Sequence, residues 1–299
     1  MQQVVDRPTL GARARGYVTL TKPRIIELLL VTTVPTMVLA ERGMPPFWLM
    51  VWTVLGGTLA AGGANAINMY VDRDIDAIMK RTQHRPLVTG VLRPAQALRF
   101  ALGIEVAAFL LLWGTVNLLS AVLAISATLF YVFVYTLWLK RTSTHNIVVG
   151  GAAGAVPVLV GWSAVTNRLD WAPIVLFAVI FYWTPPHFWA LAIKYREDYA
   201  AADVPMLPAV ASLRTTASRI VAYTVVLWAL TLLFSPVAGM GNLYLVSAVG
   251  LGAVFMGLAL QLLRTSTPAA AMRLFAYSIT YITLLFGAMA ADQLLRSGL

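Results

Sequence analysis

Nine long apolar segments restrict this chain to one class of fold. The hydrocarbon core of a bilayer is about 30 Å thick, and a helix of roughly 20 mostly apolar residues crosses it. Over 299 residues the chain is 60% hydrophobic and only 11% charged, far outside the range of soluble domains. We therefore expect an all-α polytopic membrane protein. The nine expected transmembrane helices are Ile25–Ala40, Phe47–Ala66, Phe100–Val116, Leu118–Trp138, Ile147–Val165, Ile174–Leu191, Ile220–Pro236, Leu243–Leu263 and Leu274–Ala291.

The connections between these segments differ in chemistry. The connection after the second segment, Asn65–Arg99, and the one after the sixth are rich in polar and charged residues. The connections after the first, third, fifth and seventh segments are short and poor in charge. Two dense connections separated by four helices predict two related four-helix halves that face each other, with a ninth helix added. We expect a single domain over residues 1–299, in which residues 1–20 form a cytoplasmic N-terminal segment.

The basic residues predict the orientation of the chain in the membrane. Lys and Arg accumulate in short cytoplasmic loops. With nine helices, all but three of the 22 basic residues fall on the side of the N-terminus, and the exceptions are Arg42, Arg168 and Arg296. We therefore expect the N-terminus and both dense connections in the cytoplasm and the C-terminus outside, in the inner membrane of a bacterium.

Charge and cysteine content narrow the classes of partner and chemistry. The net charge of +10 follows mainly from the topology, and it fits anionic lipid headgroups and a polyanionic substrate as partners. It gives no reason to expect nucleic acid. The sequence contains no cysteine, which excludes disulfides, thiolate metal sites and a thiol nucleophile.

A polar stripe begins where the second apolar segment ends. Asn68, Asp72 and Asp76 recur every fourth residue, so on a helix they lie on one face, and Asn65 stands one turn before them. Two carboxylates and an amide at a membrane boundary indicate a cation site. Mg²⁺ is usually held by one or two carboxylates together with a phosphate-bearing substrate. Basic residues follow at once, so the carboxylates could instead pair with them on a solvated face. These basic residues are Lys80, Arg81 and Arg85.

The connection after the sixth segment carries a second group of charges. Lys194 and Asp198 are four residues apart and share a helix face, with Glu197 beside them. As an isolated pair they indicate a surface salt bridge of little energetic weight. On the same side of the membrane as the first stripe, they would instead form the second wall of a site for a diphosphate and its metal.

Two further residues have two interpretations each. His187 lies among aromatic residues, between Trp183 and Phe188. A buried histidine is more often a hydrogen-bonded core residue, but imidazole is also a natural axial ligand or hydrogen-bond partner of a haem. Glu105, inside the third segment, is a membrane-embedded carboxylate and hence a functional candidate. Pairing of Glu105 with Arg99 is equally open.

Several spaced motifs resemble those of a known family. The Asn68-x3-Asp72-x3-Asp76 stripe resembles the first aspartate-rich motif of the UbiA superfamily of intramembrane prenyltransferases, which also has nine helices and active connections after helices 2 and 6. Three other motifs resemble the haem-farnesylating branch of that superfamily, and the resemblance covers residues 17–290. They are Arg81-Thr-x2-Arg85-Pro-Leu-x2-Gly90, Trp183-Thr-Pro-Pro-His187-Phe-Trp-Ala-Leu191 and Val204-Pro-Met-Leu-Pro208. Many members carry a second aspartate pair where this chain has Lys194 and Asp198, so Lys194 is expected to contact diphosphate directly as a point charge.

The resemblance implies a reaction, a cofactor and roles for individual residues. Farnesyl diphosphate would lose its diphosphate, and its C1 would join a vinyl group of haem b with addition of water, giving haem O for haem A and terminal oxidase biogenesis. Mg²⁺ would be the cofactor. Haem A synthase or terminal oxidase assembly factors would be partners beside the membrane lipids. The implied metal ligands are Asn68, Asp72, Asp76 and Asp198, and Asn65 would support catalysis beside them. Diphosphate would be bound by Lys80, Arg81, Arg85 and Lys194. An allylic cation would be stabilised by Tyr131, Tyr135, Tyr182 and Trp183, and haem would be bound by His187.

Two other functions remain as alternatives. A quinone or aromatic-acid prenyltransferase of the same superfamily would keep the first motif but would leave the motif at Trp183–Leu191 unexplained. A secondary transporter would have substrate and ion sites near the bilayer midplane. The charges of this chain cluster at one face instead.

Overall fold

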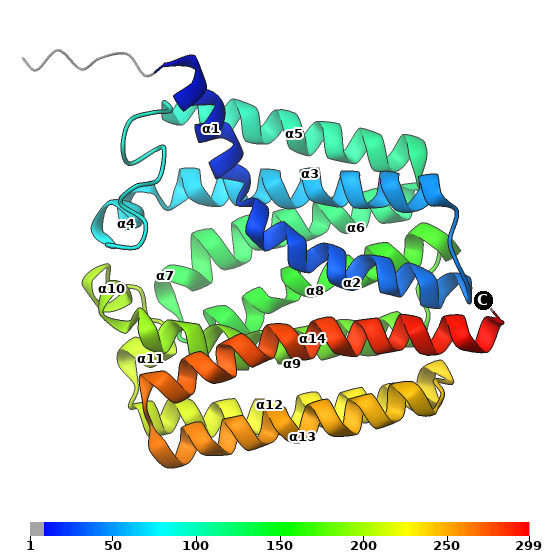
Figure 1. Ribbon diagram of the computed structural model, residues 1–299. Coiled ribbons are helices and arrows are strands. Elements are labelled where there is room, and N and C mark those ends of the chain that lie inside the picture. The colour runs from blue at the N-terminus through cyan, green and yellow to red at the C-terminus, as the bar shows by residue number, and fades with distance from the viewer. Residues whose placement is uncertain (1–8, 299) are drawn as a thin grey trace, which may run out of the picture.

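Long helices that run side by side make up the described structure. The computed structural model describes residues 9–298, without the side chains of residues 24–30. In chain order the elements are α1 (Leu10–Thr21), α2 (Pro23–Glu41), α3 (Phe47–Val71), α4 (Arg73–Ile78), α5 (Pro94–Thr115), α6 (Leu118–Leu129), the π-helix η1 (Phe130–Leu139), α7 (Lys140–Thr142), α8 (Asn146–Thr166), α9 (Trp171–Lys194), α10 (Arg196–Ala201), α11 (Leu207–Val210), α12 (Leu213–Ala238), α13 (Asn242–Thr265) and α14 (Pro268–Ser297). All are helical, which confirms the all-α prediction. In Figure 1 the short helices α4, α10 and α11 gather at one end of the bundle, here called the loop end.

The membrane bundle predicted from hydropathy is present. Eight helical runs in the described part of the chain are long and apolar enough to cross a membrane, and α6, η1 and α7 form one of these runs. The remaining predicted segment, Ile25–Ala40, lies within α2, which includes the undescribed side chains. Each of the nine predicted segments thus lies in a helical run to within one residue. The chain is an integral membrane protein.

Several helices extend past the apolar segments at the loop end. α3 continues to Val71 and α12 begins at Leu213, both beyond the predicted boundaries. Hydropathy marks only the apolar stretch, whereas a helix begins where a capping side chain satisfies its first backbone donors. Ser212 caps α12 by accepting a hydrogen bond from Thr215 N at 3.0 Å, and Thr267 caps α14 in the same way.

The stretch after Trp183, which carries one of the motifs, is helical. α9 runs through both prolines of this stretch and ends at Lys194. A proline removes one backbone donor, but membrane helices tolerate it because neighbouring groups satisfy the freed carbonyl. The second dense connection therefore begins at Tyr195, and His187 is a residue of the helix.

Among the described side chains, the buried core has one large part and two small parts. The large cluster lies between α8, α9 and the last three helices. The small clusters lie between α1, α3 and α5, and between α3, α5, α6 and α8. Close contact of α3 with α5 depends on Gly63, because a Cβ at this position would lie 2.5 Å from Glu105 Oε1. The division of the single domain into two related halves stays a prediction.

Candidate active site

The end of α3 and the start of α4 carry the polar stripe on one continuous helical path. Asp72 N donates to the Asn68 carbonyl at 2.9 Å, and Asp76 N donates to the Asp72 carbonyl at 2.8 Å. Each bond spans four residues, so the three side chains lie one turn apart, as their spacing predicts. All three residues are at most 3% exposed. Two carboxylates and an amide therefore converge at the loop end, inside the protein.

Both carboxylates are paired with cations from other parts of the chain. Arg85 Nη1 lies 2.6 Å from Asp76 Oδ2. Lys140 Nζ donates to Asp72 Oδ2, and Arg141 Nη2 lies 3.7 Å from Asp72 Oδ1. The pairing of carboxylates with cations that the sequence left open is thus present, but both carboxylates are buried instead of lying on a solvated face. Removing one partner of a buried ion pair leaves an uncompensated charge, so these pairs hold the segments together.

A fourth cation reaches the stripe from the junction of α1 and α2. Lys22 Nζ donates to Asn68 Oδ1 at 3.0 Å. Burial, followed by the positive charges of Arg85 and Lys140, lowers the pKa of Lys22 to about 7. Sequence reasoning counted Lys22 and Lys140 only as markers of topology and missed their place in the site. The one available signal was their position, since both stand at the ends of apolar segments on the predicted cytoplasmic side.

The π-helix η1 carries aromatic residues and Lys140 to the stripe. π-helical turns are rare and often occur at functional sites. Thr136 Oγ1 donates to the Tyr131 carbonyl at 2.9 Å, five residues back, and accepts from Asn68 Nδ2 at 3.2 Å. The rings of Tyr131 and Tyr135 stack with centroids 5.2 Å apart. Two of the aromatic residues expected at the site therefore lie on an element that is bonded directly to the stripe.

The two dense connections meet at the loop end. Arg81 N donates to Asp198 Oδ2 at 3.1 Å. A cavity of about 400 Å³ lies beside this contact. Its lining residues are Lys80, Arg81, Lys194, Tyr195, Glu197 and Asp198. The cations of Arg81 and Lys194 lie 5.3 Å and 5.6 Å from the centroid of the Tyr195 ring, within the range of a cation–π interaction. The second group of charges therefore adjoins the first.

His187 lies between α9 and α14. Its ring stacks on Trp183 with centroids 4.3 Å apart, and Nδ1 lies 2.6 Å from Ser278 Oγ. The Ser278 hydroxyl donates to the Phe275 carbonyl at 2.6 Å, so its oxygen accepts from Nδ1–H of His187. This assignment leaves the ring lone pair on Nε2. His187 is therefore hydrogen-bonded as a core histidine would be, and it keeps one nitrogen suited to a ligand.

Two candidate residues have partners other than those expected. Asn65 Nδ2 donates to the Thr21 carbonyl at 3.2 Å, which ties α3 to the end of α1. Glu105 is buried and accepts from Thr128 Oγ1 at 3.2 Å. Arg99 does not reach this carboxylate and donates instead to a backbone carbonyl of its own helix at 3.2 Å. Asn65 and Glu105 thus connect helices close to the stripe.

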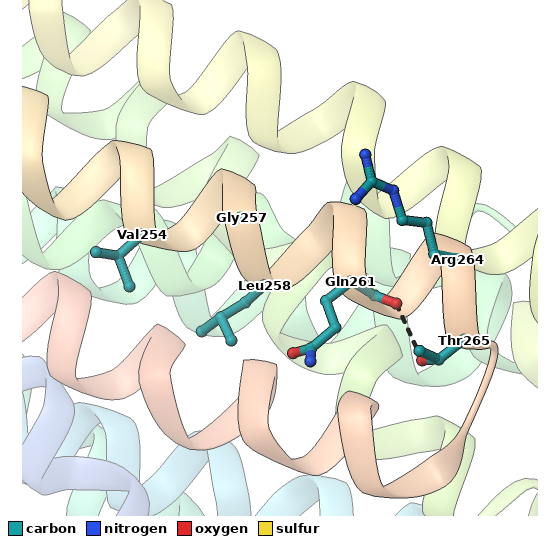
Figure 2. Close-up of a pocket in the computed structure, with 6 residues that line it drawn as sticks. All are labelled: Val254, Gly257, Leu258, Gln261, Arg264 and Thr265. Atoms are coloured by element: carbon teal, nitrogen blue, oxygen red, sulfur yellow. Dashed lines mark hydrogen bonds between the residues drawn. The ribbon is translucent and has the colours of Figure 1, made fainter.

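A larger cavity lies elsewhere on the molecule. It lies along α13 and has a volume of about 520 Å³, and Figure 2 draws the side chains that line it. Its lining residues are Val254, Gly257, Leu258, Gln261, Arg264 and Thr265. No carboxylate of the described residues lines this hollow, so its lining differs from the metal-ligand chemistry of the stripe.

The oxygens of the stripe fit a hard divalent cation. Among the described residues Asp72 Oδ1 is buried without a hydrogen-bond donor, so a lone pair remains for a metal. The described ranges contain no group of three or more His, Cys, Asp or Glu side chains that could hold a metal ion by themselves. An ion held by Asp72 and Asp76 would take its other oxygen ligands from Asn68, water or a substrate phosphate, as Mg²⁺ commonly does.

Solved structures of other membrane proteins share this arrangement of helices. The structure of a digeranylgeranylglyceryl phosphate synthase matches with a TM-score of 0.78 at 15% identity, covering 95% of this chain and 99% of that chain. A UbiA homologue from Archaeoglobus fulgidus, bound to DMAPP and Mg²⁺, matches with a TM-score of 0.63 at 14% identity, covering 91% of this chain and 99% of that chain. At these identities the likeness shows the fold.

Curated relatives are closer in sequence. A protein named protoheme IX farnesyltransferase from Parafrankia sp. (strain EAN1pec) is 57% identical, covering 95% of this chain and 91% of the relative. A protein of the same name from Streptomyces coelicolor is 51% identical, covering 99% of this chain and 95% of the relative. The sequence pattern of the UbiA prenyltransferase family matches residues 29–286. The resemblance seen in the motifs is confirmed, and the chain belongs to the UbiA prenyltransferase family.

Proposed function

We propose that the chain transfers the farnesyl group of farnesyl diphosphate to a vinyl group of haem b, with addition of water, to form haem O. The observation that carries the proposal is the identity of more than half of the residues, over nearly the whole chain, with proteins named protoheme IX farnesyltransferase. The chemistry of the stripe agrees with it, because buried carboxylates surrounded by cations suit a diphosphate that arrives with a metal.

Mg²⁺ is the proposed cofactor, with Asp72 and Asp76 as its main protein ligands. A UbiA homologue from Archaeoglobus fulgidus has been solved with GPP and Mg²⁺, which supports a metal-dependent reaction. When bound, the metal would offset the negative charge that grows on the leaving diphosphate. Asn68 donates to Asp72 Oδ2 at 2.7 Å and would orient this carboxylate. Asp198, in the connection after α9, is proposed as a further metal ligand.

The cations around the stripe are proposed to bind the diphosphate. Arg85 and Lys140 lie closest to the two carboxylates, and Lys22 lies beside Asn68. Arg81 and Lys194 line the adjoining cavity. Fixed cations aimed at oxygens whose negative charge grows in the transition state lower the barrier to departure of the diphosphate. The same cavity is lined by Lys80, which would steer the anionic substrate toward the site.

The carbon chemistry needs no strong nucleophile or base. The C1–O bond of farnesyl diphosphate breaks, and the diphosphate leaves with the electron pair. The π-electrons of the haem vinyl group form the new bond to C1, and water then adds to the other vinyl carbon and loses a proton. The faces of Tyr131 and Tyr135 are proposed to stabilise the positive charge at C1, each by about 1–2 kcal/mol when desolvated. Nε2 of His187 is proposed to bind or orient the haem.

The loop end is proposed to face the cytoplasm. Nearly all basic residues in the described part of the chain belong to the segments that meet there, and short cytoplasmic loops are rich in such residues. In this orientation the N-terminus is cytoplasmic and the C-terminus lies outside. Farnesyl diphosphate and haem b would then reach the stripe from the cytoplasmic side of the membrane.

One assay tests the function against its two alternatives. Purified protein in lipid vesicles is incubated with Mg²⁺, farnesyl diphosphate and haem b, and the products are identified by mass spectrometry. We expect haem O and free diphosphate, and loss of both when EDTA is added. Farnesylation of 4-hydroxybenzoate in place of haem b would favour a quinone-type enzyme. Transport of a substrate without release of diphosphate would favour a transporter.

A further inference from the structure

Two cations occupy the carboxylates that are proposed to hold the metal. Lys140 Nζ donates to Asp72 Oδ2, and Arg85 Nη1 lies 2.6 Å from Asp76 Oδ2. The carboxylate side chains are 0% and 3% exposed, and their cations are 12% and 15% exposed. Buried charges are costly without a partner. A metal ion that takes either carboxylate would therefore leave a largely buried cation in need of another anion.

The charge at the stripe opposes a divalent cation that arrives alone. Asp72 and Asp76 carry two negative charges, and Lys140 and Arg85 balance them with two positive charges. Arg141 also lies 3.7 Å from Asp72 Oδ1, and its own charge is balanced by Asp74. A diphosphate that arrives together with the metal changes this balance, because its oxygens accept hydrogen bonds from both displaced cations.

The structure around Lys140 permits such a change of partner. A lysine side chain has a flexible stem and three rotatable donors. The next residue, Arg141, is anchored independently, since its two terminal nitrogens each lie 2.8 Å from an Asp74 oxygen. Arg141 also donates to the Val71 carbonyl at 3.3 Å. The backbone at the end of η1 can therefore stay in place while the Lys140 side chain turns away from Asp72.

We propose that Lys140 and Arg85 take the place of the divalent cation at Asp72 and Asp76 in the ligand-free protein, and that both transfer to the diphosphate when it binds with its metal. This inference rests on the proposed function of the site. Binding of the divalent cation and binding of the diphosphate would then be cooperative. Each alone meets charges of its own sign at the site, whereas together the metal takes the two carboxylates and the diphosphate takes the two cations. The opposing interpretation is that the ion pairs are permanent supports of the packing between the segments.

Lys140→Met distinguishes these interpretations, because it removes a competitor of the metal and a partner of the diphosphate in one change. We expect the affinity for Mn²⁺ alone, a spectroscopic substitute for Mg²⁺, to rise about tenfold and the affinity for inorganic diphosphate alone to fall about tenfold, a size typical of coupling between sites. Electron paramagnetic resonance of free Mn²⁺ and calorimetry in metal-free buffer measure these affinities on the full chain in nanodiscs. Permanent supports predict that both affinities fall together or that neither changes, and either result overturns the proposal.

The chain offers a matched control for this variant. Arg99 is an exposed cation near the start of α5 that donates to the Ala95 carbonyl. Arg99→Met removes one positive charge without touching either ion pair, so both affinities should stay at the wild-type level. Lys140→Arg keeps the charge and should keep the weak binding of Mn²⁺ alone. Tight binding of Mn²⁺ by Lys140→Arg would overturn the proposal.

The wild-type protein still tests the inference if Lys140→Met does not fold. Mn²⁺ should bind at least about tenfold more tightly when diphosphate is present, after subtraction of a protein-free titration. Equal binding in both conditions overturns the inference. Haem O formation is measured in the same preparation, so active protein with independent binding of the two ligands overturns the inference alone. Protein that forms no haem O and binds no diphosphate overturns the proposed function as well.

Discussion

The side-chain amide of Asn68 donates to Asp72 Oδ2 at 2.7 Å, one helical turn away. The same amide nitrogen donates to Thr136 on η1, and the amide oxygen accepts from Lys22 at the junction of α1 and α2. Asn68 therefore joins three segments around one carboxylate. Only an amide supplies both the donors and the acceptor that this arrangement uses, because an ionised carboxylate accepts only. This explains physically why the stripe starts with asparagine.

Loss of either carboxylate is expected to abolish farnesyl transfer. Asp72→Ala and Asp76→Ala each remove a proposed metal ligand and should lower turnover by about 100-fold or more, the size seen when one strong electrostatic contact to a transition state is lost. Turnover is measured as haem O formed per protein in the membrane fraction. Asp203→Asn is the control, because Asp203 is an exposed carboxylate at the loop end, outside the stripe. Near-normal turnover in both alanine variants would contradict the metal assignment.

The geometry of Arg85 should matter as well as its charge. Lysine keeps the charge but loses the planar fork that binds two oxygens at once. Arg85→Lys should therefore lower turnover, and Arg85→Ala should lower it further, by about 100-fold. The same order is expected at Arg81. Farnesyl diphosphate binding and diphosphate release are measured on each purified variant. If both alanine variants bind and ionise farnesyl diphosphate like the wild type, these arginines serve structure and topology and do not bind the diphosphate.

The register of the stripe could be predicted from sequence because it depends on local spacing. One ladder of backbone hydrogen bonds runs through Asn68, Asp72 and Asp76, so residues four apart share a face. The membrane segments could be predicted for the same reason, since apolar length is a property of neighbouring residues. The residues of both dense connections were also identified, because polar clusters at the ends of apolar segments are conspicuous in an apolar chain.

The partners of Asp72 and Asn68 could not be predicted because they come from distant segments. Lys140 reaches Asp72 across 68 residues, and Lys22 reaches Asn68 across 46 residues. The π-helix η1 also prevents prediction of these contacts. Sequence patterns are interpreted with the α-helical period of 3.6 residues, but the hydrogen bonds of a π-helix join residues five apart. The expected period therefore assigns side chains of η1 to the wrong face of the helix. Spacing along the chain carries no information on contacts of this kind.

Gly150 is expected to hold the Tyr135 ring in place by its lack of a side chain. A Cβ at Gly150 would lie 2.4 Å from Tyr135 Cδ2. Gly150→Ala should therefore displace the ring, destabilise the protein by about 1–3 kcal/mol and lower turnover. Gly154→Ala on the same helix is the control, because a Cβ there would meet nothing within 4 Å. Thermal unfolding and haem O formation are measured on both variants. Equal behaviour of the two would show that the Tyr135 ring tolerates a shift.

His187→Ala is expected to remove haem binding and keep farnesyl diphosphate binding. Ser278 accepts from Nδ1–H of His187 and so keeps the lone pair on Nε2, the nitrogen that would ligate or orient a haem. Haem binding by absorbance titration and farnesyl diphosphate binding are measured on the same purified variant. His145→Ala, a change at an exposed histidine, should leave both unchanged. Ser278→Ala keeps the imidazole but removes the group that fixes its proton, so haem affinity should fall about tenfold, as for other hydrogen-bond partners of ligating histidines. An unchanged haem titration of His187→Ala with normal haem O formation would exclude the role, and parallel loss of both substrates would favour a packing role between α9 and α14.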